Sequence, residues 1–405
     1  MKKYWSVIAI SVMIVASIGT FYMQSIWAEN EKPVFMIETI NGNEQEIEPL
    51  LLGGYYNDGL NYLDYTGVDF EISLEGIKYF GEQSFFERIN EIYGGIGSER
   101  IKQFQKDHRH FMRGKYYSIN SYFENEEYLA YADVSYKNPY EVSSELQFSI
   151  AVLDKQKNKT TSFEHLVPNS GDFWYLDPVK VQVIDDQLKV ITQNDMREDD
   201  SRKIHQYTFD LTKKKLLSEE VILSIENKEN EYIEMEQLNV DDPTKESEYV
   251  AFVKRSMEPN EEGYLESVTG EDLVVYDLTA NTSEIINLEN LAEHGYPEYL
   301  DGQHIYLTNT DDNGVLNVSV YDIKSEQIID HIEGPALDNE IAKTTAFNDG
   351  KFFIVDSYID YETPAYITVI ELQNGEIVFE GEIVREDQKG AIEKANLNIY
   401  NVFFK

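Results

Sequence analysis

The alternation of apolar and polar residues divides most of the chain into short strands joined by polar turns. The stretch Asp272–Leu291, DLVVYDLTANTSEIINLENL, contains an apolar strand ending at Leu278, a polar turn and a second strand through Ile285 and Ile286. A two-residue period of this kind predicts a β-hairpin. The pattern recurs in four further stretches, which begin at Phe148, Ile204, Leu316 and Ala365. A unit that returns about every 45 to 65 residues predicts a repeat architecture.

A further strand or strand pair precedes each of these hairpins. The five preceding segments are Glu126–Tyr136, Val179–Thr192, Glu248–Arg255, Tyr299–Asn309 and Ala346–Ser357. An inner pair followed by an outer hairpin makes a unit of four strands, which is the composition of a propeller blade. The predicted fold class is therefore all-β, a single β-propeller of six to seven four-stranded blades that occupies residues 32–405.

The two ends of this domain are expected to pair. The segment Ala391–Lys405 finishes in LNIYNVFF, an inner-strand pattern with no hairpin after it. Strand-like segments also fill Lys32–Phe80, where Asn41-Gly42-Asn43 predicts a hairpin turn. Pairing the N-terminal and C-terminal strands would remove two exposed sheet edges, so we expect the propeller to close in this way.

The segment Gln83–Met112 departs from the strand pattern. Its apolar residues recur three and four positions apart on both sides of Gly94-Gly95. This spacing predicts a short helical insert at 83–112, made of two amphipathic helices joined at the glycines. Such an insert either packs across a sheet or presents a surface to a partner.

The N-terminal segment predicts contact with a membrane. Residues 1–4 include Lys2 and Lys3, and no charged residue follows in 5–28. An apolar run of this length spans a bilayer as a helix, and the preceding positive charge orients it with the N-terminus inside. We expect a cytoplasmic tail at 1–4, a transmembrane anchor at 5–28 and an extracytoplasmic domain. The alternative is a cleaved signal peptide and a secreted protein, although Ile26-Trp27-Ala28 matches a cleavage site poorly.

Composition narrows the classes of partner. The chain has 75 Asp and Glu against 34 Lys and Arg, a formal net charge of -41, which argues against nucleic-acid binding. It has no cysteine, which excludes disulfides and thiolate metal sites.

The blade pattern resembles that of a known group. Asp301-Gly302-Gln303-His304-Ile305-Tyr306, followed by Val318-Ser319-Val320-Tyr321-Asp322-Ile323, is similar to the repeats of bacterial β-propeller repeat proteins. The sequence lacks the Trp-Asp ending of WD40 blades and the repeated Trp and Gly of quinoprotein propellers. The resemblance implies a fold and no particular activity.

No motif for chemistry stands out. The chain has seven His, of which only His108 and His110 are close together, and two helical residues at that spacing do not share a face. The acidic pairs Asp185-Asp186 and Asp241-Asp242 fit strand-joining turns. Four aspartates recur at equivalent repeat positions and fit a turn role, namely Asp154, Asp210, Asp277 and Asp322. Catalytic residues are thus unknown, and no cofactor or metal is expected.

The expected function is that of a membrane-anchored extracytoplasmic binding or scaffolding module at the bacterial cell surface. Its partner is expected to be a protein or another cell-envelope component. Two alternatives remain: a cell-envelope hydrolase or lyase that uses the central channel of the propeller, and a sensor or assembly factor for a membrane complex.

Overall fold

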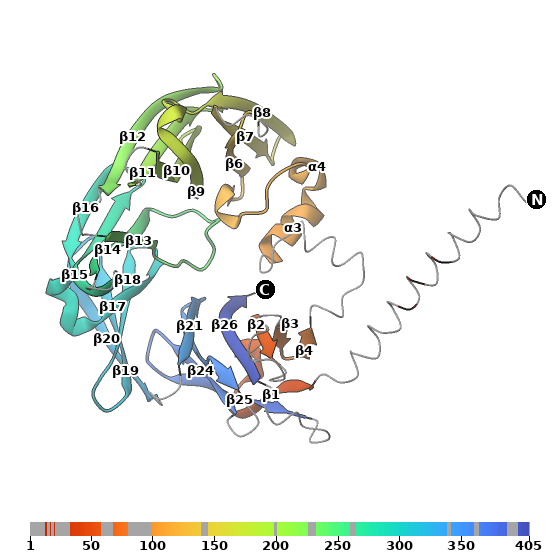
Figure 1. Cartoon of the computed structure of the whole chain (residues 1–405), viewed down its shortest axis with the longest axis vertical. Coiled ribbons are helices and arrows are strands. Elements are labelled where there is room, and N and C mark those ends of the chain that lie inside the picture. The colour runs from red at the N-terminus through yellow and green to blue at the C-terminus, as the bar shows by residue number, and fades with distance from the viewer. Residues whose placement is uncertain are drawn as a thin grey trace, which may run out of the picture. The chain divides into compact units, whose positions relative to one another are not determined.

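The structure is a computed structural model of the 405-residue chain. It describes Met13, Ser17 and Thr20, and residues 33–57, 68–79, 99–138, 145–197, 201–225, 232–259, 265–337, 342–359, 364–386 and 396–404. The chain divides into two compact units (Figure 1). The first unit comprises Met1–Gly97 and Asp338–Lys405, and the second comprises Ser98–Leu337.

The second unit contains four antiparallel sheets of four strands each within the described residues. Every sheet is a meander whose strands follow the chain order, so the first strand of each sheet lies at one edge. The first sheet consists of β5 (Tyr122–Glu124), β6 (Tyr128–Tyr136), β7 (Leu146–Asp154) and β8 (Lys159–Leu166). The second sheet consists of β9 (Phe173–Ile184), β10 (Gln187–Met196), β11 (Arg202–Asp210) and β12 (Lys215–Ile225). The third sheet consists of β13 (Tyr232–Gln237), β14 (Tyr249–Pro259), β15 (Leu265–Asp277) and β16 (Thr282–Asn287). The fourth sheet consists of β17 (Tyr296–Asp301), β18 (His304–Thr310), β19 (Val315–Asp322) and β20 (Gln327–Ala336). The predicted four-strand units are confirmed here.

The first unit joins strands from both ends of the chain. One sheet has the order β1 (Phe35–Gly42), β25 (Ile377–Arg385), β24 (Ala365–Glu371), β22 (Lys351–Asp356), β21 (Lys343–Asn348). The other has the order β23 (Tyr358–Ile359), β26 (Asn396–Phe404), β2 (Leu50–Asn57), β3 (Val68–Ser73), β4 (Gly76–Tyr79). β2 pairs antiparallel with β26 from Leu50 opposite Phe404 to Asn57 opposite Asn396. The predicted pairing of N-terminal and C-terminal strands is confirmed.

The hairpin predicted at Asn41-Gly42-Asn43 is wrong, because β1 and β2 belong to different sheets. Gly42 has φ of 90°, and the side chain of Asn43 accepts a hydrogen bond from the backbone N–H of Gln45. This cap starts a 3-10 helix, Glu44–Ile47, which carries the chain from one sheet to the next.

The repeated aspartates have the predicted turn role. Each accepts a hydrogen bond at Oδ1 from the backbone N–H three residues later, at 2.7–2.8 Å, in the turns after Asp154, Asp210, Asp277 and Asp322. The residue four positions after each aspartate has positive φ in all four turns. These residues are Asn158, Lys214, Asn281 and Glu326. The repeat in the sequence is therefore a repeat of turn geometry.

Each unit has its own apolar core. In the first unit, Leu52, Phe70 and Ile399 come together between the two sheets. In the second unit, Phe148, Tyr207 and Phe209 fill the space between the first and second sheets. Leu273, Leu300 and Ile305 fill the space between the third and fourth sheets. Alternate residues of each strand supply these side chains, as the two-residue period predicts.

Two short helices pack on the first sheet of the second unit. They are α3 (Glu99–Asp107) and α4 (Arg109–Met112), and Ile101, Phe104 and Phe111 contact Tyr122 and Tyr131 of that sheet. The helical insert is thus confirmed for its second half, and it packs across a sheet, whereas 83–98 lies outside the described residues. The described part of this unit also has three 3-10 helices. Ile119–Ser121 precedes β5, Ser170–Asp172 joins β8 to β9, and Leu288–His294 joins β16 to β17.

The predicted tail at 1–4 and anchor at 5–28 lie outside the described residues, apart from Met13, Ser17 and Thr20. In the part of the chain that the structure describes, no helix has the length and apolar character needed to cross a bilayer.

Candidate functional site

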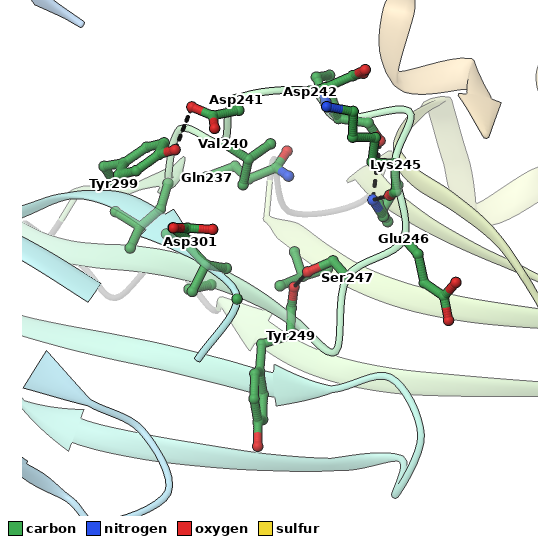
Figure 2. Close-up of a pocket in the computed structure, with 17 residues that line it drawn as sticks. Gln237, Val240, Asp241, Asp242, Lys245, Glu246, Ser247, Tyr249, Tyr299 and Asp301 are labelled. Atoms are coloured by element: carbon green, nitrogen blue, oxygen red, sulfur yellow. Dashed lines mark hydrogen bonds between the residues drawn. The ribbon is translucent and has the colours of Figure 1, made fainter. Parts of the chain in front are cut away.

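A cavity of about 220 Å³ opens in the second unit beside the connection from β13 to β14, residues 238–248 (Figure 2). We call this connection the pocket loop. It supplies eight of the seventeen lining residues. The others come from the end of β13, the start of β14, the end of β17 with the turn after it, and one residue of β9. The lining residues are Lys180, Gln237, Leu238, Val240, Asp241, Asp242, Pro243, Lys245, Glu246, Ser247, Tyr249, Val250, Ala251, Tyr299, Leu300, Asp301 and Gly302.

Backbone contacts fix the start of the pocket loop. Asn239 forms a parallel bridge with Tyr299, in which Asn239 N donates to Glu298 O at 3.3 Å and Leu300 N donates to Asn239 O at 2.9 Å. The Asp242 carboxylate then accepts from the backbone N–H of Thr244 at 2.9 Å and from its hydroxyl at 2.6 Å. This is an Asx turn, so the turn role predicted for the Asp241-Asp242 pair is confirmed for Asp242.

Two side chains of β9 hold the middle of the pocket loop. Lys180 is 4% exposed, and its Nζ donates to Pro243 O at 3.0 Å and to Lys245 O at 2.6 Å. Burial lowers the pKa of Lys180 to about 8, against the opposing effect of Asp242 and Glu246. Gln182 exchanges two hydrogen bonds of 2.9 Å with the backbone of Ser247. A buried amine and amide therefore satisfy backbone groups that would otherwise lack partners.

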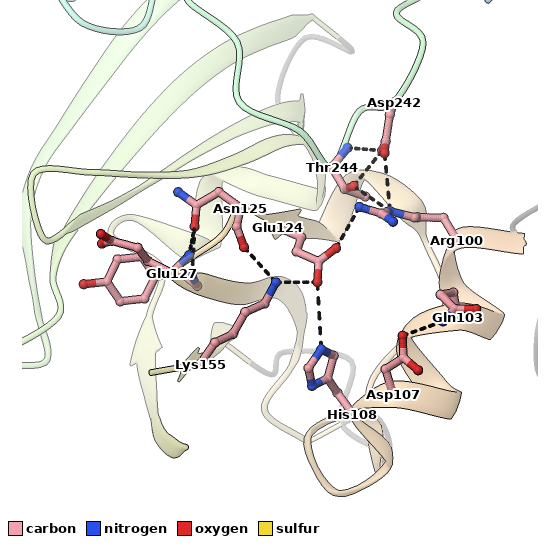
Figure 3. Close-up of polar contacts among 11 residues, drawn as sticks. Arg100, Gln103, Asp107, His108, Glu124, Asn125, Glu127, Lys155, Asp242 and Thr244 are labelled. Carbon is pink, nitrogen blue, oxygen red and sulfur yellow. Dashed lines mark hydrogen bonds and ion pairs between the residues drawn. The ribbon is translucent and has the colours of Figure 1, made fainter. Parts of the chain in front are cut away.

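A charged cluster holds the outer side of the pocket loop (Figure 3). Arg100, near the start of α3, lies 2.7 Å from Glu124 Oε2 and 3.3 Å from Asp242 Oδ2. Glu124 also accepts from Lys155 Nζ at 2.6 Å, and its backbone N–H donates to Thr244 O at 2.7 Å. Arg100 thus connects α3, β5 and the pocket loop through two carboxylates in one partly buried network.

The other side of the cavity is acidic and aromatic. The hydroxyl of the buried Tyr299 donates to Asp241 Oδ1. Burial raises the pKa of Asp301, and the charge of Asp241 raises it further. Burial, with the charges of Asp301 and Asp241, also raises the pKa of the neighbouring Tyr306 to about 12. A cation bound beside Asp241 and Asp301 would offset the repulsion between their two carboxylates.

Most residues singled out in the sequence lie away from this cavity. His108 contacts the charged cluster at 3.8 Å from Glu124 Oε1, whereas His110 is exposed. The four repeated aspartates lie in outer turns. Among the described residues, no group of three or more His, Asp or Glu is placed to hold a metal ion.

Lys180 and Gln182 were not predicted as site residues from the sequence. Both lie in Val179-Lys180-Val181-Gln182-Val183, where polar residues alternate with valines, and both are buried. Alternation normally indicates one solvated face. The signal that distinguishes this strand is the long connection at 238–248, which covers its polar face.

Comparisons with known proteins identify no family. No protein-family model matches the sequence, and no curated protein matches it. The solved structures that are similar in fold over part of the chain include the following three. They are the uncharacterized protein lmo1340 from Listeria monocytogenes EGD-e (10% identity, TM-score 0.33), the β-propeller domain of the Trilobed protease from Pyrococcus furiosus (14%, 0.28) and the acylaminoacyl peptidase of Pyrococcus horikoshii (10%, 0.34).

These matches cover 65%, 51% and 63% of this chain. The chain spans less than two thirds of each of those structures, namely 64%, 57% and 38%. With every TM-score below 0.5, the likeness assigns neither a family nor an activity to this chain.

Proposed function

We propose that the six sheets are the blades of a single β-propeller, which serves as a membrane-anchored extracytoplasmic binding module. The four meanders of the second unit and the pairing of β2 with β26 support this arrangement. In a propeller, chain ends that share a sheet remove the two strand edges that an open array would expose. Under this proposal the sheet that contains β26 and β2 is the closing blade.

The pocket is the proposed binding site, and a basic side chain of a partner protein is the proposed ligand group. The observation that carries this proposal is a cavity whose main wall is fixed by contacts to α3, β5, β9 and β17. A wall fixed before binding costs little conformational entropy when the ligand enters. The mutually repelling Asp241 and Asp301 favour a lysine or arginine over a neutral or acidic group.

The test is photocrosslinking of the full-length protein in its native membranes. A photoreactive amino acid is placed at Lys245, on the pocket rim, and in a matched protein at Lys157, an exposed residue of the β7–β8 turn. We expect one partner to crosslink through position 245 and not through position 157. The double variant Asp241→Asn, Asp301→Asn should lose this crosslink. Equal crosslinking from both positions, or persistence of the crosslink in the double variant, would contradict the proposal.

A further inference from the structure

A separate surface of the second unit lies where β9 begins. Trp174 and Tyr175 are consecutive, and they are 47% and 49% exposed. β9 is the edge strand of its sheet, so it pairs with β10 on one side only. Tyr175 lies about 17 Å from Lys180 at the rise of a β-strand, which separates this surface from the pocket. Exposed Trp and Tyr are the residue types that contribute most to protein interfaces.

The two rings are held in place by polar contacts. The Arg197 guanidinium lies over the Trp174 ring, 4.5 Å from its centroid, and Arg197 Nε donates to Phe173 O at 2.6 Å. The Tyr136 hydroxyl donates to the backbone carbonyl of Trp174. Tyr175 hydrogen-bonds with Asp195, whose carboxylate lies 2.9 Å from Arg202 Nε. Rings fixed in this way lose little side-chain entropy on binding.

Carboxylates lie beside these rings. Asp195 is opposite Tyr175 in the β9–β10 register, and Asp177 is two residues farther along β9, so all three share one sheet face. Burial raises the pKa of Asp177, and the charge of Asp195 raises it further. Burial also raises the pKa of Asp133 on β6, and Asp177 adds to that effect. Arg202 pairs with Asp195 and Arg197 lies over Trp174, so the three carboxylates exceed the two guanidinium groups by one negative charge.

We propose that Asp133, Trp174, Tyr175 and Asp177, here called the β9 surface, bind a segment of a partner protein that carries lysine or arginine side chains. A cationic side chain gains from the Tyr175 ring, from the part of the Trp174 ring that Arg197 does not cover, and from the nearby carboxylates. A second copy of this chain is a poor occupant, because its net charge of -41 opposes approach. The β9 surface stands independently of the pocket, since the two sets of residues do not overlap.

The test is binding of a short fluorescent peptide of alternating Lys and Ser to the full-length protein, followed by anisotropy. Asp177→Asn and Trp174→Ala should each weaken binding about fivefold, the size expected when one cation loses a carboxylate or a ring. The matched controls are Asp69→Asn, an exposed aspartate of the first unit, and Tyr232→Ala, a ring that is 44% exposed. Both controls should change the affinity less than about twofold.

Other outcomes are equally informative. If the two controls weaken binding as much as Asp177→Asn, the peptide responds to the overall charge and the proposal is overturned. If a peptide of Ser alone, or a neutral oligosaccharide, binds as tightly as the Lys peptide, a basic partner is excluded. If Asp301→Asn weakens binding and Asp177→Asn does not, the peptide occupies the pocket, which overturns the β9 surface and leaves the proposed function standing.

Discussion

The pairing of the chain ends gives the most direct test of the proposed ring, through Leu397 of β26. Leu397 is 0% exposed and packs in the core of the first unit with residues from both ends of the chain. Leu397→Ala removes three carbon atoms, which at ~0.8 kcal/mol each is about 2.4 kcal/mol of lost burial. The cavity left behind adds to this, so we expect a loss of about 3–4 kcal/mol in the free energy of unfolding.

The same strand offers a matched control. Tyr400 is 50% exposed and has no residue opposite it, because Gly53 pairs with Asn401 and Gly54 pairs with Ile399. Tyr400→Ser gives up mainly the ring contact with Tyr55, whose centroid lies 6.2 Å away. We expect a loss of about 1 kcal/mol or less, since aromatic pairs contribute about 0.5–1.5 kcal/mol.

The assay is urea unfolding of the full-length protein, with hydrogen exchange followed strand by strand. The unfolding midpoint and slope give the change in free energy. In a closed ring, Leu397→Ala should speed exchange in β10 of the second unit as well as in β2 and β3. Faster exchange confined to the first unit would refute closure while leaving the β2–β26 pairing intact. A loss below about 1 kcal/mol would refute the burial argument itself.

Three further outcomes are expected. Gly54→Ala should cost about 1–3 kcal/mol in thermal or urea unfolding, because its Cβ would lie 2.0 Å from Asn398 O, whereas Gly270→Ala, with no atom within 4 Å, should cost little. Burial lowers the pKa of His205, so the unfolded chain binds its proton more readily, and the free energy of unfolding should fall as pH drops below about 6.5. His205→Asn should remove this fall in the free energy of unfolding at low pH. A variant that keeps the same pH dependence would contradict the role of His205. Arg100→Gln should speed amide exchange in the pocket loop several-fold, and equal acceleration by the exposed Arg109→Gln would rule out a specific contact.

Sequence periodicity predicted the strands because burial in a sheet is a local, two-residue property. The hairpins at Phe148, Ile204, Leu316 and Ala365 coincide with β7–β8, β11–β12, β19–β20 and β24–β25. The end pairing was also predictable, since an apolar terminal strand requires a partner. The turn at Asn41-Gly42-Asn43 was not, because Asn and Gly favour a hairpin turn and a helix cap alike, and only the tertiary pairing of β2 with β26 selects the cap.

The candidate site was beyond prediction for a different reason. Its decisive contacts join residues far apart in the sequence, such as Arg100 with Asp242 and Lys180 with Pro243. Periodicity reports whether a side chain is buried and not which loop buries it. Lys180 alternates with valines in β9, and this alternation predicts that the lysine side chain faces solvent. The side chain is buried because the pocket loop places the backbone carbonyls of Pro243 and Lys245 against its amine.

The place where the repeat is interrupted supports a functional role for the pocket loop. In the neighbouring sheets, the first two strands are joined by tight turns, Asp185-Asp186 between β9 and β10 and Gly302-Gln303 between β17 and β18. In the sheet between them, the corresponding connection is the whole of residues 238–248. A tight turn would join β13 to β14 equally well, so the extra length is not needed to pair these two strands. In repeat proteins, such insertions fall on loops of one face that is often the binding face. The pocket loop is held by contacts to four other elements and lines part of the cavity. We therefore propose that residues 238–248, which interrupt the repeat, take part in binding.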